Sequence, residues 1–194
     1  RPVLALLGDG EMRRSRDVKD AMADAFGLSA EERAELLPSG RQRTIDNRVD
    51  TEENCFAQVK RFLSYMPQNV WEMPPEVTCT DPVDRCDEEL LSIVPRDRRR
   101  PYNMRKLIEH VVDRGSVFEI QPTYGKGLIT VLARMNGKVV GVIANNPMVY
   151  GGAIDVRGAR KQTHFVELCD CFHIPIIFLV DVPGFMVGRD AEAA

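Results

Sequence analysis

The sequence predicts an α/β fold, because segments with strand patterns and segments with helical periodicity alternate along its second half. Residues 128–135 and 138–145 are apolar runs joined by Asn136-Gly137, the dipeptide that most strongly indicates a tight β-hairpin. Residues 174–180, IPIIFLV, form an unbroken apolar run, which is typical of a strand covered on both faces. Composition and periodicity alone define no more than this class.

Helical patterns dominate before residue 67. Residues 18–25 and 29–37 each predict a short helix. A third helix is clearer, because Thr51 is a plausible N-cap and Pro67 ends the pattern. Its apolar stripe consists of Phe56, Val59, Phe62, Leu63 and Met66. Such a stripe is typical of a helix that packs on a core, and not of a cofactor site.

Residues 67–100 differ from the rest of the chain in composition. Prolines recur between Pro67 and Pro101, and acidic residues lie among them, so no long periodic element is expected. The segment is therefore expected to be an extended but ordered linker.

The elements expected after the linker are a helix, a strand, the hairpin, a glycine turn, a second helix and the apolar strand. The first helix runs from Met104 to Val112, and Gly115 occupies the position of a left-handed C-terminal cap. A short strand at 117–120 precedes the hairpin, and Gly151-Gly152 follows it. The second helix has one apolar face, formed by Phe165, Leu168, Cys169 and Phe172.

The bulk properties exclude some classes of function. The chain has 44% hydrophobic and 28% charged residues, which is ordinary for a globular protein. Its formal charge of -3 gives no general attraction to nucleic acid or to an anionic membrane. No apolar run approaches the ~20 residues that span a bilayer, and Arg1 opens no signal peptide. A location in the cytoplasm or in a mitochondrial matrix is expected.

The cysteines and histidines do not form a recognisable metal or nucleophile site. Five cysteines include no C-x-x-C pair, so no bound metal is expected, and the thiols are expected to be reduced. Cys169 falls on the apolar face of its helix and Cys171 on the other side. The three histidines are scattered, and no serine or cysteine lies in a recognisable nucleophile elbow.

The glycine turn is the strongest candidate for chemistry. In residues 145–155, NNPMVYGGAID, two consecutive glycines stand at the mouth of a strand. Without a Cβ, the backbone can turn with its N–H groups directed outward, toward an oxygen that develops negative charge. That is the chemistry of an oxyanion hole. A Gly-Gly pair by itself is more often an ordinary tight turn. Only the longer sequence pattern around it can therefore favour an oxyanion hole over a structural turn.

Three long segments carry a family resemblance: RPYNMRKLIEHVVDRGSVFEIQP (100–122), LITVLARMNGKVVGVIANNPMVYGGAID (128–155) and FVELCDCFHIPIIFLVDVPGFMVGRDAEA (165–193). They resemble the carboxyltransferase (β) subunit of biotin-dependent acyl-CoA carboxylases, of the propionyl-CoA and acetyl-CoA carboxylase type. Residues 50–67 match more weakly, and the first fifty residues match poorly. The family's subunit is considerably longer and is built from two crotonase-like halves, so the chain looks like a central fragment.

The resemblance implies an incomplete crotonase-like (ClpP-like) spiral of ββα units. Residues 1–66 would be the C-terminal tail of the first half, 67–100 the link, and 101–194 the N-terminal part of the second half. The implied activity is transfer of a carboxyl group from carboxybiotin to the α-carbon of a short-chain or branched acyl-CoA, with propionyl-CoA and acetyl-CoA favoured.

Other functions remain as alternatives to this one. They are a biotin-dependent acyl-CoA decarboxylase or transcarboxylase subunit, a methylcrotonyl-CoA-type carboxylase subunit, and a non-catalytic acyl-CoA-binding or assembly module. The fragment alone is expected to be inactive, because half of each oxyanion hole and most of the coenzyme A site would lie elsewhere.

The resemblance also assigns roles around the glycine turn. The backbone N–H groups of Gly152 and Ala153 would form the oxyanion hole on the biotin side, and Gly151 would give the backbone room to approach. Asp155 would shape the pocket for the acyl group, or would instead cap the turn that follows it.

Positions farther along the chain carry weaker assignments. The turn of Pro183, Gly184 and Phe185 would wall the biotin side of the site, with a purely structural turn as the alternative. Lys161 matches a basic position of the family, but a solvent-exposed lysine is favoured. The basic cluster at 96–105 could meet a phosphate of coenzyme A, but a solvated loop and helix start is favoured. His164 stands where many members carry arginine, which leaves the acyl substrate open.

The implied cofactors are biotin, carried on a partner protein, and coenzyme A as part of the substrate. The implied partners are biotin carboxylase and the biotin carboxyl carrier subunit. Further copies of the chain would form a dimer-based homo-oligomer, with a hexamer favoured. No nucleic acid, membrane or metal is among the implied partners.

Overall fold

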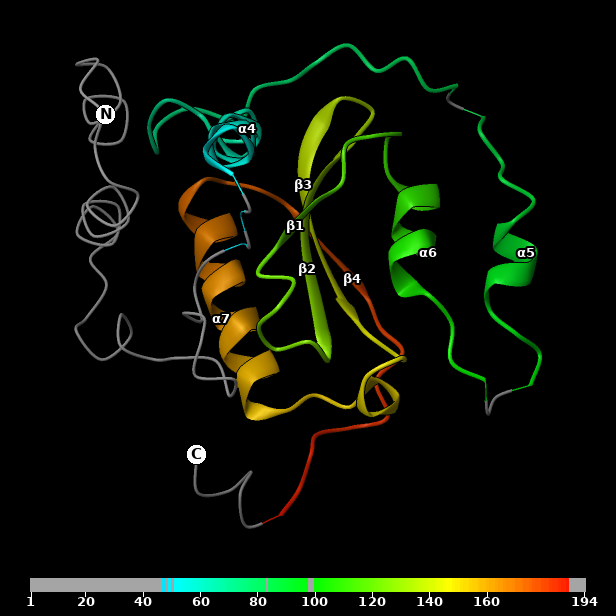
Figure 1. The fold of residues 1–194 in the computed structure, drawn as a ribbon. Coiled ribbons are helices and arrows are strands. Elements are labelled where there is room, and N and C mark those ends of the chain that lie inside the picture. The colour runs from blue at the N-terminus through cyan, green and yellow to red at the C-terminus, as the bar shows by residue number, and fades with distance from the viewer. Residues whose placement is uncertain (1–46, 48, 50, 83, 98–99, 189–194) are drawn as a thin grey trace.

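Four strands form one sheet at the centre of the described chain (Figure 1). The computed structural model describes residues 47, 49, 51–82, 84–97 and 100–188, so the helices expected at 18–25 and 29–37 lie outside the described residues. The strands, in order across the sheet, are β1 (Phe118–Ile120), β2 (Leu128–Met135), β3 (Lys138–Asn145) and β4 (Ile176–Leu179). The pairs β1–β2 and β2–β3 are antiparallel, whereas β4 joins β3 in parallel.

The β2–β3 hairpin turns at the predicted Asn136-Gly137. Both residues have positive φ, 51° and 79°, as a type I′ turn requires. The Asp113 carboxylate accepts both turn amides, with the nitrogen of Asn136 2.9 Å from Oδ1 and the nitrogen of Gly137 2.7 Å from Oδ2. The resulting register pairs Leu128 with Asn145 at the open end of the hairpin. The predicted hairpin is confirmed.

Helices cover both faces of the sheet (Figure 1). Helix α7 (Val156–Cys171) connects β3 to β4 and packs on one face, and α6 (Met104–Val111) packs on the other. Successive side chains of β2 alternate between the faces because a strand has a period of two. Leu132 therefore belongs to the core on the α7 side and Val131 to the core on the α6 side.

Helix α7 lies unusually close to β3 at Gly141. A Cβ on this glycine would lie 2.8 Å from the Cys169 Sγ, so glycine is what permits the close approach. Cys169 is buried and Cys171 is exposed, as the helical spacing predicts. Burial raises the pKa of the Cys169 thiol to about 12, which keeps it protonated and unreactive.

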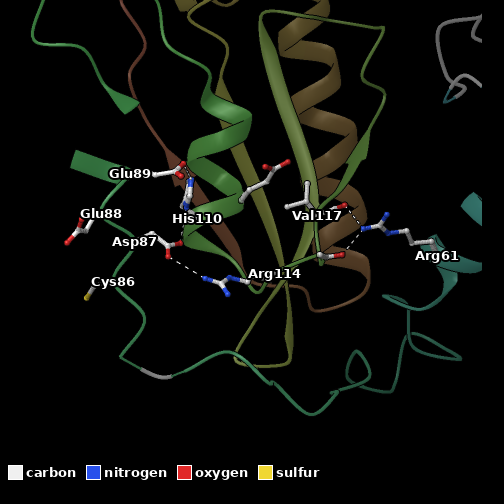
Figure 2. A pocket seen from close by; sticks show the side chains of 10 residues that line it. Arg61, Cys86, Asp87, Glu88, Glu89, His110, Arg114 and Val117 are labelled. Atoms are coloured by element: carbon white, nitrogen blue, oxygen red, sulfur yellow. Dashed lines mark hydrogen bonds and ion pairs between the residues drawn. The ribbon is translucent and has the colours of Figure 1, made fainter. Parts of the chain in front are cut away.

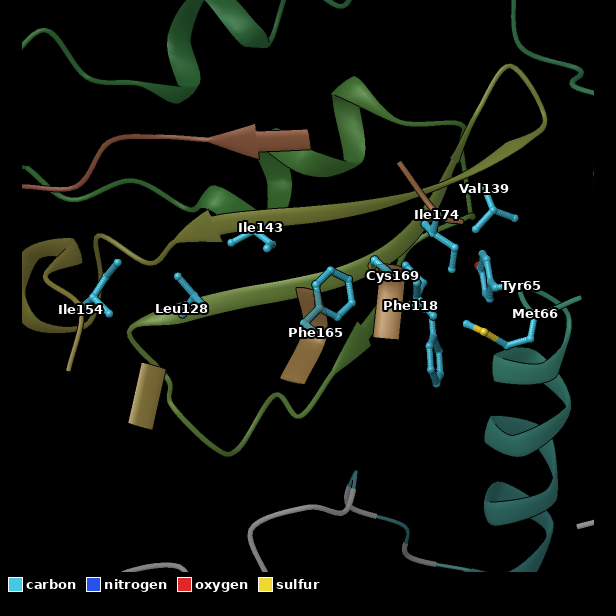
Figure 3. Close-up of a cluster of buried hydrophobic side chains, with 11 residues drawn as sticks. Tyr65, Met66, Phe118, Leu128, Val139, Ile143, Ile154, Phe165, Cys169 and Ile174 are labelled. Carbon is cyan, nitrogen blue, oxygen red and sulfur yellow. The ribbon is translucent and has the colours of Figure 1, made fainter. Parts of the chain in front are cut away.

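The helix predicted after Thr51 is present as α4 (Glu52–Leu63), and the Thr51 side chain caps it. Tyr65 and Met66, just beyond its end, enter the core on the α7 side (Figure 3). The Arg134 guanidinium lies 5.1 Å from the centre of the Tyr65 ring and donates to backbone carbonyls of both this segment and the linker. One buried arginine therefore joins three segments that are distant in sequence.

The linker is mostly without regular structure, apart from the short helix α5 (Leu90–Ile93), which the proline pattern does not indicate. It is fastened to α6 through Arg85. The Arg85 guanidinium donates to the carbonyls of His110 at 2.7 Å and Val112 at 2.8 Å, and it pairs with Asp81. These bonds explain why a proline-rich segment is ordered here.

Strand β4 differs from its prediction. A strand covered on both faces was expected, but among the described strands β4 pairs only with β3, and Phe178 is 51% exposed. Ile176 packs on the α7-side core and Ile177 on the α6-side core, so each face is only partly covered. The predicted cover on both faces is therefore present only in part, because the two cores reach Ile176 and Ile177 but leave Phe178 exposed among the described residues.

None of the described helices is both long enough and apolar enough to cross a lipid bilayer.

Candidate functional site

The glycine turn lies between the end of β3 and the start of α7. Tyr150–Gly152 form a single 3-10 turn, and Tyr150, Gly151 and Gly152 all have positive φ, at 51°, 61° and 88°. Glycine adopts this conformation without steric cost at two of the three positions. The turn therefore places a tightly wound stretch of backbone at the C-terminal end of β3.

The N–H groups of Gly152 and Ala153 are not free in this conformation. The Gly152 nitrogen lies 2.9 Å from the Val149 carbonyl oxygen, and the Ala153 nitrogen lies 3.2 Å from that of Tyr150. The sequence predicts free N–H groups, whereas the structure uses both to close the turn. The Ala153 bond is at the long limit, and a shared bond would let its N–H reach a second acceptor. Among the described residues, none accepts a hydrogen bond from the Gly151 N–H.

The two glycines are required for different reasons. A Cβ on Gly152 would lie 2.7 Å from the Asn145 Nδ2 and 3.3 Å from the Asp181 carbonyl oxygen, so side chains are excluded by packing as well as by φ. A Cβ on Gly151 would meet no heavy atom within 4 Å. The space over Gly151 is therefore open, as the expectation of room for approach at this position requires.

The loop that follows β4 lies against the glycine turn. The Ile154 nitrogen lies 3.1 Å from the Gly184 carbonyl oxygen, and the Met186 nitrogen lies 2.9 Å from the Ile154 carbonyl oxygen. This isolated bridge brings Phe185 beside the turn, with 72% of the residue exposed. The structure thus brings the two predicted parts of the site, 151–153 and 183–185, side by side.

Asp155 caps α7. Its Oδ1 accepts the Gly158 N–H at 2.7 Å, and its backbone is extended, as an N-cap requires. Of the two readings that the sequence leaves open for Asp155, the cap is therefore present in the structure. A role in shaping an acyl pocket stays a prediction.

A second network, which sequence reasoning missed, lies directly under the glycine turn. The Asn145 side chain exchanges two hydrogen bonds with the backbone of Asp181: Nδ2 donates to the carbonyl oxygen at 2.7 Å, and Oδ1 accepts from the nitrogen at 2.9 Å. The Tyr102 hydroxyl donates to the Asp181 Oδ2 at 2.7 Å. Partial burial and the nearby Asp181 carboxylate raise the pKa of Tyr102 to about 12, so the hydroxyl stays a donor.

Lys161 is buried, which corrects the expectation of a solvent-exposed lysine. Its exposed fraction is 1%, and its Nζ donates to the Leu128 carbonyl oxygen at 2.9 Å. Burial lowers the pKa of the ammonium group to about 8, although the Glu119 carboxylate acts in the opposite direction. Its place on the buried face of α7, with Phe165 and Cys169, explains the burial.

Stability of the protein should therefore rise with pH above 8 because of Lys161. Its pKa is about 8 in the folded chain and 10.5 ordinarily, so the unfolded state binds more protons in this window. We expect the free energy of unfolding of the full-length protein to gain up to roughly 3 kcal/mol, relative to Lys161→Met, between pH 8 and pH 10.5. Urea unfolding of both proteins at several pH values measures this difference, in which the Cys169 and Tyr102 contributions cancel. Parallel curves would contradict the assigned pKa.

A cavity of about 710 Å³ lies away from the glycine turn, between the linker and α6 (Figure 2). Asp87 pairs with two of the other groups that line it: the His110 Nδ1 lies 2.9 Å from the Asp87 Oδ2, and the Arg114 guanidinium lies 3.6 Å from Oδ1. The hydrogen bond from His110, with help from Arg85, lowers the pKa of the Asp87 carboxyl. We infer that these ion pairs hold the linker against α6. No group of metal-binding side chains occurs among the described residues.

Comparison with known proteins identifies the family. The sequence model described as the carboxyl transferase domain matches residues 41–194. The chain belongs to the carboxyl transferase domain family. The mitochondrial propionyl-CoA carboxylase beta chain of Homo sapiens is 41% identical over 150 residues, which cover 77% of this chain and 27% of that protein. The methylmalonyl-CoA decarboxylase subunit alpha of Veillonella parvula is 41% identical over 144 residues, which cover 74% and 28%.

Solved structures of the family confirm the fold. A crystal structure of transcarboxylase 12S, a hexamer with hydrolysed methylmalonyl-coenzyme A bound, has a TM-score of 0.75 at 33% identity. The likeness covers 90% of this carboxyl transferase chain and 35% of that chain. The predicted incomplete crotonase-like fold is therefore confirmed. The chain spans little more than a quarter of the length of the curated relatives described above.

A second family model also matches the chain. The model described as the Mrr N-terminal domain matches residues 1–51, and it overlaps the carboxyl transferase match at 41–51. Within residues 1–51, the structure describes Asn47, Val49 and Thr51. The predicted domain boundaries, at 66/67 and 100/101, stay predictions.

Proposed function

We propose that the longer protein containing this segment is a carboxyltransferase component. It transfers a carboxyl group from carboxybiotin to the α-carbon of a short-chain or branched acyl-CoA, and propionyl-CoA and acetyl-CoA are the favoured substrates. Family membership supports the reaction class, and the 41% identity to a propionyl-CoA carboxylase beta chain supports the substrate class. The observation that carries the proposal for this segment is the glycine turn at the open end of β3.

The reaction needs hydrogen-bond donors more than it needs a nucleophile. The α-carbon of the acyl-CoA loses a proton and forms a bond to the carboxyl carbon, while the bond from that carbon to the biotin nitrogen breaks and this nitrogen takes up a proton. Negative charge develops on the thioester oxygen and on the ureido oxygen of biotin. A preorganised N–H donor at such an oxygen typically contributes ~2.7 to 4 kcal/mol of transition-state stabilisation.

The residues of the turn fit a biotin-side site. Biotin, when bound, supplies the activated carboxyl group. Open space over Gly151 lets a ring approach the backbone, and the exposed side chain of Phe185 offers an apolar surface beside the turn. The N–H groups of Gly152 and Ala153 are the proposed donors; each would have to turn from its carbonyl partner within the turn toward the oxygen, and the 3.2 Å bond of Ala153 is the longer of the two. The N–H of Gly151 lies beside them.

The neighbouring residues complete the proposed site. Pro183 and Gly184 carry Phe185 to the turn through the bridge at Ile154 and would wall the biotin side. Asp155 caps α7 at the C-terminal end of the turn, so a substitution there would act on both the helix and the proposed acyl pocket.

A second candidate is the reverse or coupled reaction. The methylmalonyl-CoA decarboxylase subunit alpha of Veillonella parvula matches with the same 41% identity, and the transcarboxylase 12S structure matches over 90% of the chain. A decarboxylase or transcarboxylase component would use the same glycine turn, with the carboxyl group moving toward biotin or between two acyl groups.

Partners follow from the proposed reaction. Biotin would arrive on a carrier protein and be carboxylated by a biotin carboxylase. A dimer-based homo-oligomer, up to a hexamer, is proposed by likeness to the transcarboxylase 12S hexamer. We also propose a location in the cytoplasm or in a mitochondrial matrix.

The full-length protein, combined with biotin carboxylase and biotinylated carrier, tests the proposal. Incorporation of labelled bicarbonate is measured with acetyl-, propionyl- and methylcrotonyl-CoA, and release of carbon dioxide is measured with methylmalonyl-CoA. We expect biotin-dependent turnover, fastest with propionyl-CoA or acetyl-CoA. Folded protein that turns over no acyl-CoA in either direction would refute the enzyme function and leave the non-catalytic module.

A further inference from the structure

We propose that Asn145, together with Tyr102, is a positioning residue that holds Asp181 and, through it, the glycine turn in the geometry needed for transfer. The inference rests on the proposed function of the turn. Neither residue faces the open space above Gly151 as a donor; both act through the backbone and side chain of Asp181.

The Asn145 side chain extends the sheet beyond the last strand pair. Strands β3 and β4 pair up to Ala144 and Leu179, after which the chains diverge. The Asn145 amide, with one acceptor and one donor, then binds both backbone polar groups of Asp181. Asn145 is 1% exposed, so its amide groups are shielded from water and depend on Asp181 for their hydrogen bonds.

The same amide supports the glycine turn from below. The position of a Cβ on Gly152 is only 2.7 Å from the Asn145 Nδ2 and 3.3 Å from the Asp181 carbonyl oxygen. The backbone of Gly152 therefore rests on the hydrogen bond between Asn145 and Asp181. A shift of Asp181 would therefore displace the backbone of Gly152, which packs against it. It would also displace the start of the loop that contains Phe185.

Tyr102 holds Asp181 from the other side. It lies just before α6, and its hydroxyl reaches the Asp181 carboxylate across 79 positions of sequence. Asp181 is thus fixed by its backbone to β3 and by its side chain to the α6 segment. A displacement of ~1 Å in a group that takes part in the reaction can lower the rate about 10²-fold. Loss of the bonds that hold Asp181 should therefore affect the transfer step more than substrate binding.

Three variants of the full-length protein test the proposal. Asn145→Ala removes both bonds to Asp181, and Asn145→Asp keeps the shape but replaces the donor by an acceptor. Tyr102→Phe removes only the bond to the carboxylate. The control is Asp113→Ala, which also removes two hydrogen bonds between a side chain and the backbone, but at the opposite end of the hairpin. Each variant is assayed for kcat and KM with the best acyl-CoA, and for amide hydrogen exchange at Asp181 and Met186.

We expect Asn145→Ala to lower kcat roughly 10- to 100-fold, with KM for the acyl-CoA changed less than about three-fold. Exchange at Asp181 and Met186 should accelerate, whereas Asp113→Ala should accelerate exchange only at the hairpin turn and leave kcat unchanged. Asn145→Asp should recover activity relative to wild type as the pH falls, because a protonated carboxyl can again donate to the Asp181 carbonyl. A purely space-filling asparagine would show no such recovery.

The outcomes separate this inference from the proposed function. Wild-type kcat in Asn145→Ala, or unchanged exchange at Asp181, would overturn the positioning role. If Asn145→Ala does not fold, Tyr102→Phe decides: a lower kcat with faster exchange at Asp181 supports the role, and no change in either overturns it. If the wild-type protein turns over no acyl-CoA, the proposed function fails, while hydrogen exchange still tests whether Asn145 and Tyr102 hold Asp181.

Discussion

Replacement of Gly152 by valine is expected to abolish carboxyl transfer by the full-length protein, a loss of roughly 10³-fold or more, while most of the fold persists. Gly152 has φ of 88°, and the valine Cβ would lie 2.7 Å from the Asn145 Nδ2. The turn must therefore shift, which displaces the N–H groups of residues 151–153. Transfer assays, with thermal unfolding as the check on folding, measure both parts of the expectation.

Gly151→Ala is the matched control for this prediction. Its φ of 61° also disfavours a side chain, at a cost of roughly 1–2 kcal/mol, but its Cβ meets open space. We expect this variant to keep the turn in place, so its loss of transfer reports how far a methyl group fills the space that the biotin ring would use, and this loss should be smaller than in Gly152→Val. Near-normal transfer by Gly152→Val would refute the role assigned to Gly152.

The local elements could be predicted from the sequence because local chemistry decides them. Asn136-Gly137 specifies a turn with two positive φ values, and Thr51 specifies the start of α4 through its side-chain bond. The close packing of α7 on β3 follows similarly from the apolar face that contains Cys169. Each of these features needs only a few neighbouring residues to be recognised.

The burial of Lys161 was predicted incorrectly although the signal was present. Residues 161, 165 and 169 are spaced by four, which places Lys161 on the same helix face as Phe165 and Cys169. Exposure was predicted because a charged lysine usually lies at the protein surface, although the spacing indicated a buried position. A backbone carbonyl at the start of β2, which no local pattern reveals, accepts the ammonium group.

The details of the candidate site depend on contacts between distant segments. Asn145 and Asp181 are 36 positions apart, and Tyr102 is a further 43 positions from Asn145, so periodicity cannot pair them. Whether the N–H groups of Gly152 and Ala153 are free depends on the dihedral angles of the turn. The edge position of β4 depends on which strands lie beside it. The sequence therefore indicates where the site lies but not how it is supported.

Replacement of Ala153 by proline should remove one donor of the proposed oxyanion hole, at a cost in stability. Ala153 has φ of -67°, the value that a proline ring fixes. The ring takes the place of an N–H that donates to the Tyr150 carbonyl oxygen at 3.2 Å, so the turn loses this bond and must also move that oxygen away from the ring. If the N–H contacts an oxygen in the transition state, transfer should fall ~10²–10³-fold.

The most direct test of the glycine turn as a biotin-side oxyanion hole compares Ala153→Pro with Ala153→Ser, which retains the N–H. The measurement is the single-turnover rate of carboxyl transfer from the carboxylated carrier to propionyl-CoA by the full-length protein, with thermal unfolding recorded for each variant. We predict a ~10²–10³-fold fall for Ala153→Pro and less than about a three-fold change for Ala153→Ser. Ala153→Pro should unfold at a lower temperature than Ala153→Ser, and the rates are compared at a temperature where both are folded. Transfer by folded Ala153→Pro at the rate of Ala153→Ser would contradict the proposed role.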